Sequence, residues 1–151
     1  FPTSYYAWLL VADGARVAGI GGLKCGLAYD GAPNSGVDLL AWTLCADAET
    51  PVAGWPGAGS GNLISWNGET HCQRQEPLGT GTGVVAVAGY FYLTAYSPDR
   101  LTLLPHPVDG VASAIDCYQH ADVIGGAGFV PDPDRLLDEA VLTYLGRERR
   151  A

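Results

Sequence analysis

The sequence contains no methionine and few charged residues. Of its 151 residues, 16% are charged and 48% hydrophobic, whereas an ordinary soluble domain carries about 25% charged residues. Eight Lys and Arg stand against sixteen Asp and Glu, giving a net charge of −8. Nucleic-acid binding needs clustered Lys and Arg to neutralise phosphates. No apolar run of about 18 residues occurs either. The composition therefore argues against nucleic acid as a partner and against a membrane span.

Motifs of common catalytic and metal sites are also missing. The chain has no Gly-x-Ser-x-Gly, no His-Glu-x-x-His and no Rossmann glycine signature. Its histidines lie far apart in the sequence, at His71, His106 and His120. Some carboxylates could form a glycosidase pair or a weak calcium site, but such residues are more often solvated in turns: Asp30, Asp38, Asp47 and Glu49. We expect no catalytic residue, no metal and no cofactor.

Three glycines at alternate positions raise the question of a phosphate-binding loop. Gly79, Gly81 and Gly83 precede an apolar run, but a phosphate loop needs a strand before the glycines and a helix after them. The preceding segment is polar and ends at Pro77, and the following one is β-branched and aromatic. We expect a flexible turn that leads into a long strand.

Short apolar runs separated by turn residues predict an all-β chain. Turns are indicated by Asp-Gly, Asn-Gly and Ser-Pro-Asp segments. The spacing is typical of a single antiparallel β-sandwich. The expected strands are Tyr5–Ala12, Val17–Tyr29, Val37–Cys45, Asn62–Trp66, Val84–Tyr96, Leu101–Leu104 and Val111–Cys117.

The long strand predicted from Val84 to Tyr96 is apolar on both faces. One face carries Val85, Val87, Phe91, Leu93 and Ala95, and we assign it to the core. The opposite face carries Tyr90, Tyr92 and Tyr96, and aromatic residues at alternate positions suit an interface. We expect these tyrosines to be covered by another chain or by the tail. Together with the tryptophans, they could instead stack on sugar rings.

Four cysteines occur without a Cys-x-x-Cys pair, so zinc and thioredoxin-like sites are disfavoured. Two disulfides are expected, Cys45–Cys72 around the Gly/Pro-rich middle segment and Cys25–Cys117. Four buried free thiols in a cytosolic protein are the alternative. The chain starts Phe1-Pro2-Thr3, as a mature secreted protein does after its signal peptide is removed.

The pattern changes after Cys117, and we divide the chain into a sandwich at 1–120 and a tail at 121–151. Glycines at 125, 126 and 128 suggest a flexible hinge. Asp132 and Pro133 then resemble the start of a short helix. We expect the tail to pack on a neighbouring subunit through Phe129, Val130, Leu136, Leu137, Val141, Tyr144 and Leu145.

Several stretches resemble known secreted proteins. The segment from Ile20 to Asp30, which ends Leu-Ala-Tyr-Asp, resembles an early strand of cohesin-like β-sandwich modules. The segments "YDGAPNSGVDLLAWTLCADAE", "WPGAGSGNLISWNGETHCQ" and "VVAVAGYFYLTAYSPDRLTLLPHPVDGVASAIDC" are similar to small bacterial secreted proteins without an assigned activity. Cohesins bind a partner module through one sheet face, so the resemblance implies a jelly-roll-like sandwich and binding at most.

These observations predict a secreted, non-enzymatic structural protein. Low charge, two-faced apolar strands and a detachable tail favour head-to-tail self-assembly into an extracellular filament or cell-surface layer. The alternative is an extracellular binding module for polysaccharide or a protein partner, which the tryptophans and the cohesin-like strand favour. A hydrolase is the third and least favoured hypothesis.

Overall fold

The computed structural model describes residues 2–124, 127–129 and 139–145, with side chains for 2–124. These residues form strands, turns and loops and contain no helix. The strands are β1 (Thr3–Gly14), β2 (Gly22–Ala28), β3 (Val37–Leu44), β4 (Ala48–Pro51), β5 (Gly61–Ser65), β6 (Val84–Ala95), β7 (Leu101–Leu104), β8 (Ser113–Ile115), β9 (Ala121–Val123), β10 (Ala127–Phe129) and β11 (Glu139–Leu145).

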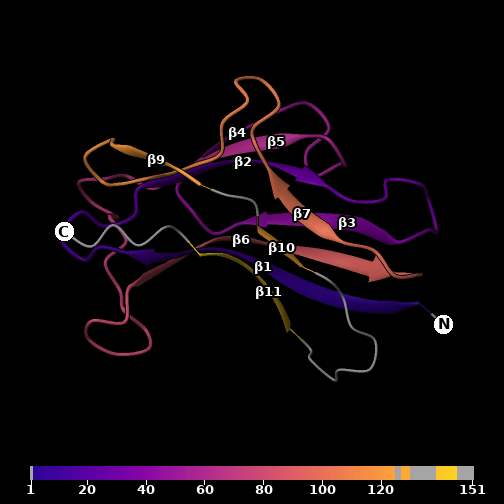
Figure 1. The fold of residues 1–151 in the computed structure, drawn as a ribbon, viewed down its shortest axis with the longest axis horizontal. Coiled ribbons are helices and arrows are strands. Elements are labelled where there is room, and N and C mark those ends of the chain that lie inside the picture. Colours follow the sequence, from indigo (N-terminus) through magenta and orange to yellow (C-terminus); the bar gives the residue numbers. More distant parts are fainter. Residues whose placement is uncertain (1, 125–126, 130–138, 146–151) are drawn as a thin grey trace.

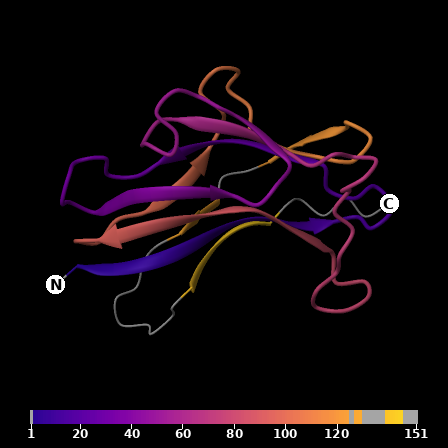
Figure 2. The same ribbon diagram turned by 180° about the vertical axis from the view of Figure 1, so that it is seen from behind.

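The strands form two sheets that lie face to face (Figures 1 and 2). We call the first the aromatic sheet, a four-stranded sheet with the order β11-β1-β6-β3. The second sheet is seven-stranded, with β10-β7-β2-β5-β4 in order and β8 and β9 branching from β2. All pairs are antiparallel except β1 with β11, which run parallel. The expected all-β chain with two antiparallel sheets is thus confirmed in its broad form.

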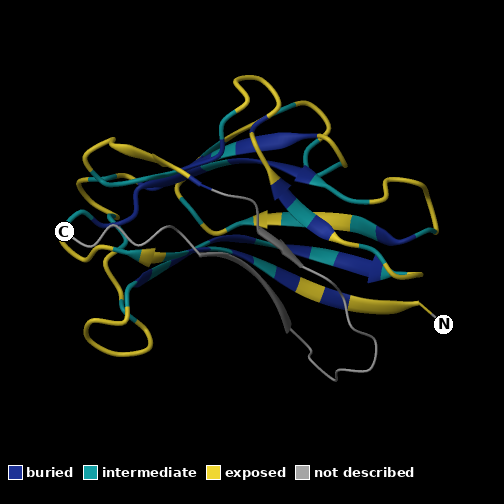
Figure 3. Ribbon diagram, in the orientation of Figure 1, coloured by how far each residue is buried: buried dark blue, intermediate teal, exposed yellow. Residues whose placement is uncertain are grey.

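The hydrophobic core lies between the two sheets (Figure 3). In β1 every second side chain is buried, because successive residues of a strand point to opposite faces. The opposing strand β2 contributes Leu23, Cys25 and Leu27, each with no exposed surface. The fully buried side chains of β1 and β6 that meet them are Ala7, Leu9, Val84, Ala88, Phe91 and Leu93.

A bulge in β6 changes which of its residues face the core. The pairing with β1 shifts between Leu9, opposite Gly89, and Leu10, opposite Val87. Our assignment of Val85 and Val87 to the core face is therefore wrong, since the buried positions before the bulge are Val84, Ala86 and Ala88. Beyond the bulge the assignment of Phe91 and Leu93 is confirmed. An extra residue in one strand shifts its alternation by one place.

Strand positions agree with the sequence where alternation is strong. All seven expected segments contain a strand, and the glycine turn at 79–83 leads directly into β6. The short strands β4, β9, β10 and β11 were not expected. A jelly-roll or cohesin-like strand order stays a prediction.

The predicted helix in the tail is wrong over its second half, because residues 139–145 form β11. The run Ala140-Val141-Leu142-Thr143-Tyr144-Leu145 is apolar and rich in β-branched and aromatic residues. Such a short apolar run fits the periodicity of a helix and that of a buried strand equally well. In the structure it forms a strand, because it pairs with β1. Val130, Leu136 and Leu137 lie outside the described residues.

Candidate functional site

An aromatic cluster lies on the outward face of the aromatic sheet. Tyr6 and Trp8 of β1 stand opposite Tyr92 and Tyr90 of β6. The ring centroids are 5.2 Å apart for Tyr6 and Tyr92, and 4.8 Å apart for Trp8 and Tyr90. A third pair, Tyr6 and Tyr90, is separated by 5.9 Å. These distances lie in the range of favourable aromatic pairs, so the four rings form one continuous surface.

The outward-facing positions of β1 and β6 around the aromatic cluster carry no charged side chain. The outward positions are Ser4, Tyr6, Trp8, Leu10 and Ala12 on β1, and Val85, Val87, Tyr90 and Tyr92 on β6. Tyr6 is 48% exposed, and its three aromatic neighbours are half-buried. Contiguous exposed apolar surfaces are a feature of interaction sites.

The sequence identified half of this cluster. Tyr90 and Tyr92 lie in it, whereas Tyr96 follows the end of β6 and is 41% exposed. Tyr6 and Trp8 were missed, although their alternation with the buried Tyr5, Ala7 and Leu9 was available as a signal. Whether another chain covers Tyr90, Tyr92 and Tyr96 stays a prediction.

The tail strands add to one edge of each sheet. β11 pairs with β1 from Tyr6 opposite Glu139 to Ala12 opposite Leu145. Within this ladder, Val141 lies opposite Trp8 and Tyr144 lies opposite Val11. β10 pairs with β7, with Phe129 opposite Leu101. Both partners belong to the same chain. The division at residue 120 and the role of these residues in subunit contact stay predictions.

A hydrogen-bonded cluster closes the sandwich where the edge strands β3 and β4 meet. Trp42 Nε1 and Asn62 Nδ2 both donate to Glu49 Oε2, each at 2.9 Å. The ring of Trp55 packs on Trp42 with centroids 5.3 Å apart. Trp55 Nε1 and Asn62 Oδ1 are buried and have no hydrogen-bond partner among the described residues. The cluster therefore combines two indole rings with a carboxylate and an amide.

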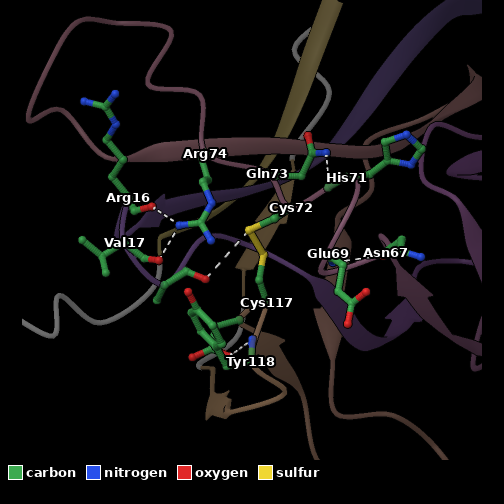
Figure 4. Close-up of a disulfide and its surroundings, with 12 residues drawn as sticks. Arg16, Val17, Asn67, Glu69, His71, Cys72, Gln73, Arg74, Cys117 and Tyr118 are labelled. Carbon is green, nitrogen blue, oxygen red and sulfur yellow. Dashed lines mark hydrogen bonds between the residues drawn. A yellow bond between two sulfur atoms is a disulfide. The ribbon is translucent and has the colours of Figure 1, made fainter.

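The disulfide joins Cys72 to Cys117 (Figure 4). Both expected pairings, Cys45–Cys72 and Cys25–Cys117, are wrong. The chain around Ile20 explains the actual pairing, because Ile20 forms a β-bridge with Gln73. The N–H of Cys117 in turn bonds the carbonyl of Ala18, so both cysteines meet beside this segment.

The other two cysteines are free thiols with different surroundings. Cys25 is fully buried in β2, and burial raises its pKa to about 12. Cys45 follows β3 and is exposed, and partial desolvation raises its pKa as well. Because the thiolate is the reactive form, neither thiol is an activated nucleophile.

Two histidines contact carboxylates in separate loops. His71 Nδ1 lies 2.8 Å from Asp47 Oδ1, and His120 Nδ1 lies 3.1 Å from Asp116 Oδ2. The hydrogen bond from the N–H of Asn67 lowers the pKa of Asp47 most, and the hydrogen bond with His71 lowers it further. No group of three or more metal-binding side chains occurs within the part of the chain that the structure describes.

None of the protein-family models, curated proteins or solved structures compared with the chain matches it. The resemblance to cohesin-like modules and small secreted proteins therefore stays a prediction. Within the described residues, no helix is long and apolar enough to cross a membrane.

Proposed function

We propose that this is a secreted, non-enzymatic structural protein that assembles with copies of itself, head to tail, into an extracellular filament or surface layer. The observation that carries this proposal is the position of the tail strands. β10 and β11 add to the edges of two different sheets and follow the described core in sequence. The disulfide Cys72–Cys117 is compatible with an oxidising compartment.

Exchange of β11 between copies is the proposed mechanism. The ladder between β1 and β11 joins segments far apart in the chain, with Trp8 opposite Val141. The β11 strand of a second copy would make the same main-chain bonds to β1 as the chain's own β11. Strand exchange of this kind is a low-cost route to assembly, and a head-to-tail contact that does not close a ring produces an open fibre. The uncharged aromatic cluster would supply additional contact area.

Deletion of residues 125–151 tests whether the tail is required. Strands β1 to β9 and the Cys72–Cys117 disulfide all precede residue 125, so we expect the shortened protein to stay folded and to form no polymers. Circular dichroism measures the fold, and electron microscopy detects polymers. Polymers of the shortened protein that match those of the full chain would remove the tail from the mechanism.

A pair of introduced cysteines tests exchange directly. Leu10 stands opposite Thr143 in the parallel ladder, so Leu10→Cys with Thr143→Cys allows a disulfide between β1 and β11. The pair is placed in a Cys45→Ser background to remove the exposed native thiol. We expect links between chains in polymers and links within a chain in dilute monomer. Polymers whose links are all within single chains would contradict exchange.

A polysaccharide-binding or protein-binding module, with the cohesin-like strand order predicted above, is the second candidate. Trp42, Trp55 and Glu49 favour it, because these side chains are partly exposed and indole faces beside a carboxylate suit sugar rings and hydroxyls. A glycan-binding screen separates the candidates. Binding by a monomer that is lost in Trp55→Ala and retained in Tyr6→Ala would favour this module over assembly.

A further inference from the structure

The outer edge of β3 lacks the usual protection of a strand edge. Within the described chain, β3 pairs only with β6. No Asp, Glu, Lys, Arg or Pro occurs from Leu39 to Ala46, and Leu40 is 57% exposed. Proteins normally protect such edges with charge, proline or a covering segment. By contrast, the outer strand of the other sheet, β4, is four residues long, carries Glu49 and ends at Pro51.

Unpaired main-chain groups on this edge can be assigned from the ladder. The N–H of Cys45 bonds the carbonyl of Ala88, so Cys45 faces β6. Main-chain groups of successive residues in a strand point to opposite sides. The N–H and C=O groups of Trp42 and Leu44 therefore point away from β6. No hydrogen bond involving these four groups occurs among the described residues.

We propose that β3 pairs with β3 of a second copy, antiparallel about a two-fold axis through Thr43. Trp42 of each copy then exchanges two hydrogen bonds with Leu44 of the other, four in all. The two aromatic sheets become one eight-stranded sheet, with the aromatic clusters on the same face. This contact does not involve the tail, so it goes beyond the head-to-tail assembly and does not depend on it.

The side chains of β3 suit pairing with itself. In this register Thr43 lies opposite Thr43, and Ala41 lies opposite Cys45, at the closely spaced positions of the ladder where side chains approach most. All three residues are exposed and small. Trp42 and Leu44 are partly buried against the core. In the proposed pair, Trp42 of one copy would lie beside Leu44 of the other. The two-fold pairing therefore introduces no bulky residue at its closest contacts.

Charge favours a second copy at this edge over other parts of the surface. Each chain carries a net charge of −8, so copies repel one another at long range, and contact costs least where no like-charged side chains are brought together. The segment from Leu39 to Ala46 is such a place. Four main-chain hydrogen bonds contribute only modestly, because water bonds the same groups in the free edge, and a five-residue edge buries less than the roughly 800 Å² per partner of a stable dimer. The isolated contact is thus weak, and cross-linking is the suitable assay.

The variant Ala41→Cys tests the register in the full-length protein. It places a thiol opposite the native Cys45 of the other copy, with Cα atoms about 4.5 Å apart, within the range of a disulfide. With oxidised glutathione we expect a dimer joined by two disulfides, measured by non-reducing electrophoresis and peptide mapping. In a Cys45→Ser background, Thr43→Cys should give a dimer joined by one disulfide.

Two controls make the result specific. Thr50→Cys places an exposed thiol on the edge strand β4, and the wild type has Cys45 as its exposed thiol. Neither protein should give a disulfide-linked dimer under the same oxidation. Equal cross-linking of Thr50→Cys, or cross-linking of the wild type without that of Ala41→Cys, would overturn the proposed pairing. No cross-linking of Ala41→Cys and Thr43→Cys would do so as well. Deletion of 125–151 should leave the Ala41→Cys dimer intact, which separates this contact from the tail.

A charge on the axis provides a measurement without cross-linking. Thr43→Lys sets two ammonium groups opposite each other, and we expect the dimer dissociation constant in sedimentation experiments to rise about fivefold. Thr50→Lys is the matched control and should leave it unchanged. An unchanged constant for Thr43→Lys would contradict the two-fold axis.

Discussion

The two ends of strand β2 are closed by different chemistry. Before β2, the segment around Gly19 lies against the Cys72–Cys117 disulfide and is bonded to Gln73 and Cys117. After β2, the turn is held by carboxylates, because Asp99 Oδ2 accepts the N–H groups of Asp30 and Val37, both at 3.0 Å. The first end depends on a covalent link and tight packing. The second depends on hydrogen bonds from main-chain N–H groups to a carboxylate side chain.

Removal of the disulfide should have the largest effect. The bond joins residues 45 positions apart, for which the chain-entropy model gives a loss of about 4 kcal/mol in the free energy of unfolding. The change is Cys72→Ala with Cys117→Ala, measured by urea denaturation. Cys45→Ser is the control, because this thiol is exposed and unpaired, and it should change the stability by less than about 0.5 kcal/mol. Equal stability of both variants would show that the bond does not hold this end.

Gly19→Ala should destabilise the same end by about 2–4 kcal/mol. Gly19 has φ +68°, and a Cβ at this position would collide with Sγ of Cys72, so backbone strain and overpacking add. Gly59→Ala is the matched control, with φ +81° and open space around the added carbon, and should cost about 1 kcal/mol. If both variants lose the same stability, the contact with the disulfide contributes nothing.

Asp99→Ala should weaken the other end by about 1–2 kcal/mol. The substitution removes the acceptor of two main-chain N–H groups. Water can replace it for the exposed Asp30 N–H but less well for the part-buried Val37 N–H. Asp99→Asn retains an acceptor oxygen and should lose less. Thermal unfolding measures both variants, and an Asn variant as unstable as the Ala variant would show that the charge, not the acceptor, matters.

Acid should produce the smallest effect, visible at both ends. The N–H of Ala32, followed by the Ser35 hydroxyl, lowers the pKa of Asp30, and the N–H of Asn67 lowers that of Asp47. A carboxyl whose folded pKa lies below its unfolded value stabilises the fold above the unfolded value, and this contribution disappears as the pH falls through the folded pKa. Stability should therefore fall as the pH drops below about 4.

The amide signals of Ala32 and Asn67 measure these two titrations by NMR. Each should show a midpoint below the ordinary value of 3.8 for Asp. Asp30→Asn should remove the pH response at Ala32 and leave that at Asn67. A midpoint at or above 3.8 would contradict the assigned hydrogen bonds.

The sequence predicted the parts of the fold that depend on local alternation. β1, β3 and β6 were located because apolar, β-branched and aromatic residues recur in them, and Tyr90 and Tyr92 were placed on an outward face for the same reason. The bulge at Ala88 and Gly89 was missed, because two small residues give no sign of an inserted position.

The remaining features depend on contacts between distant segments. The single disulfide Cys72–Cys117 follows from the bridge between Ile20 and Gln73, which no local pattern encodes. The tail was assigned to a helix because its apolar residues satisfy both periods, and pairing with β1 decides between them. Tyr6 and Trp8 became part of the aromatic cluster only once β1 was paired with β6.

The parallel ladder between β1 and β11 has a consequence for the order in which the chain is made. Leu9 of β1 pairs with Leu142, which is translated 133 residues later. During synthesis from the N-terminus, one edge of β1 therefore has no partner until almost all of the described strands exist. If copies exchange β11 as we propose, the emerging β11 competes with strands of other copies for that edge, at an effective concentration set by the connecting chain. Crowding of nascent chains, and not only the concentration of finished protein, would then influence how many copies become linked.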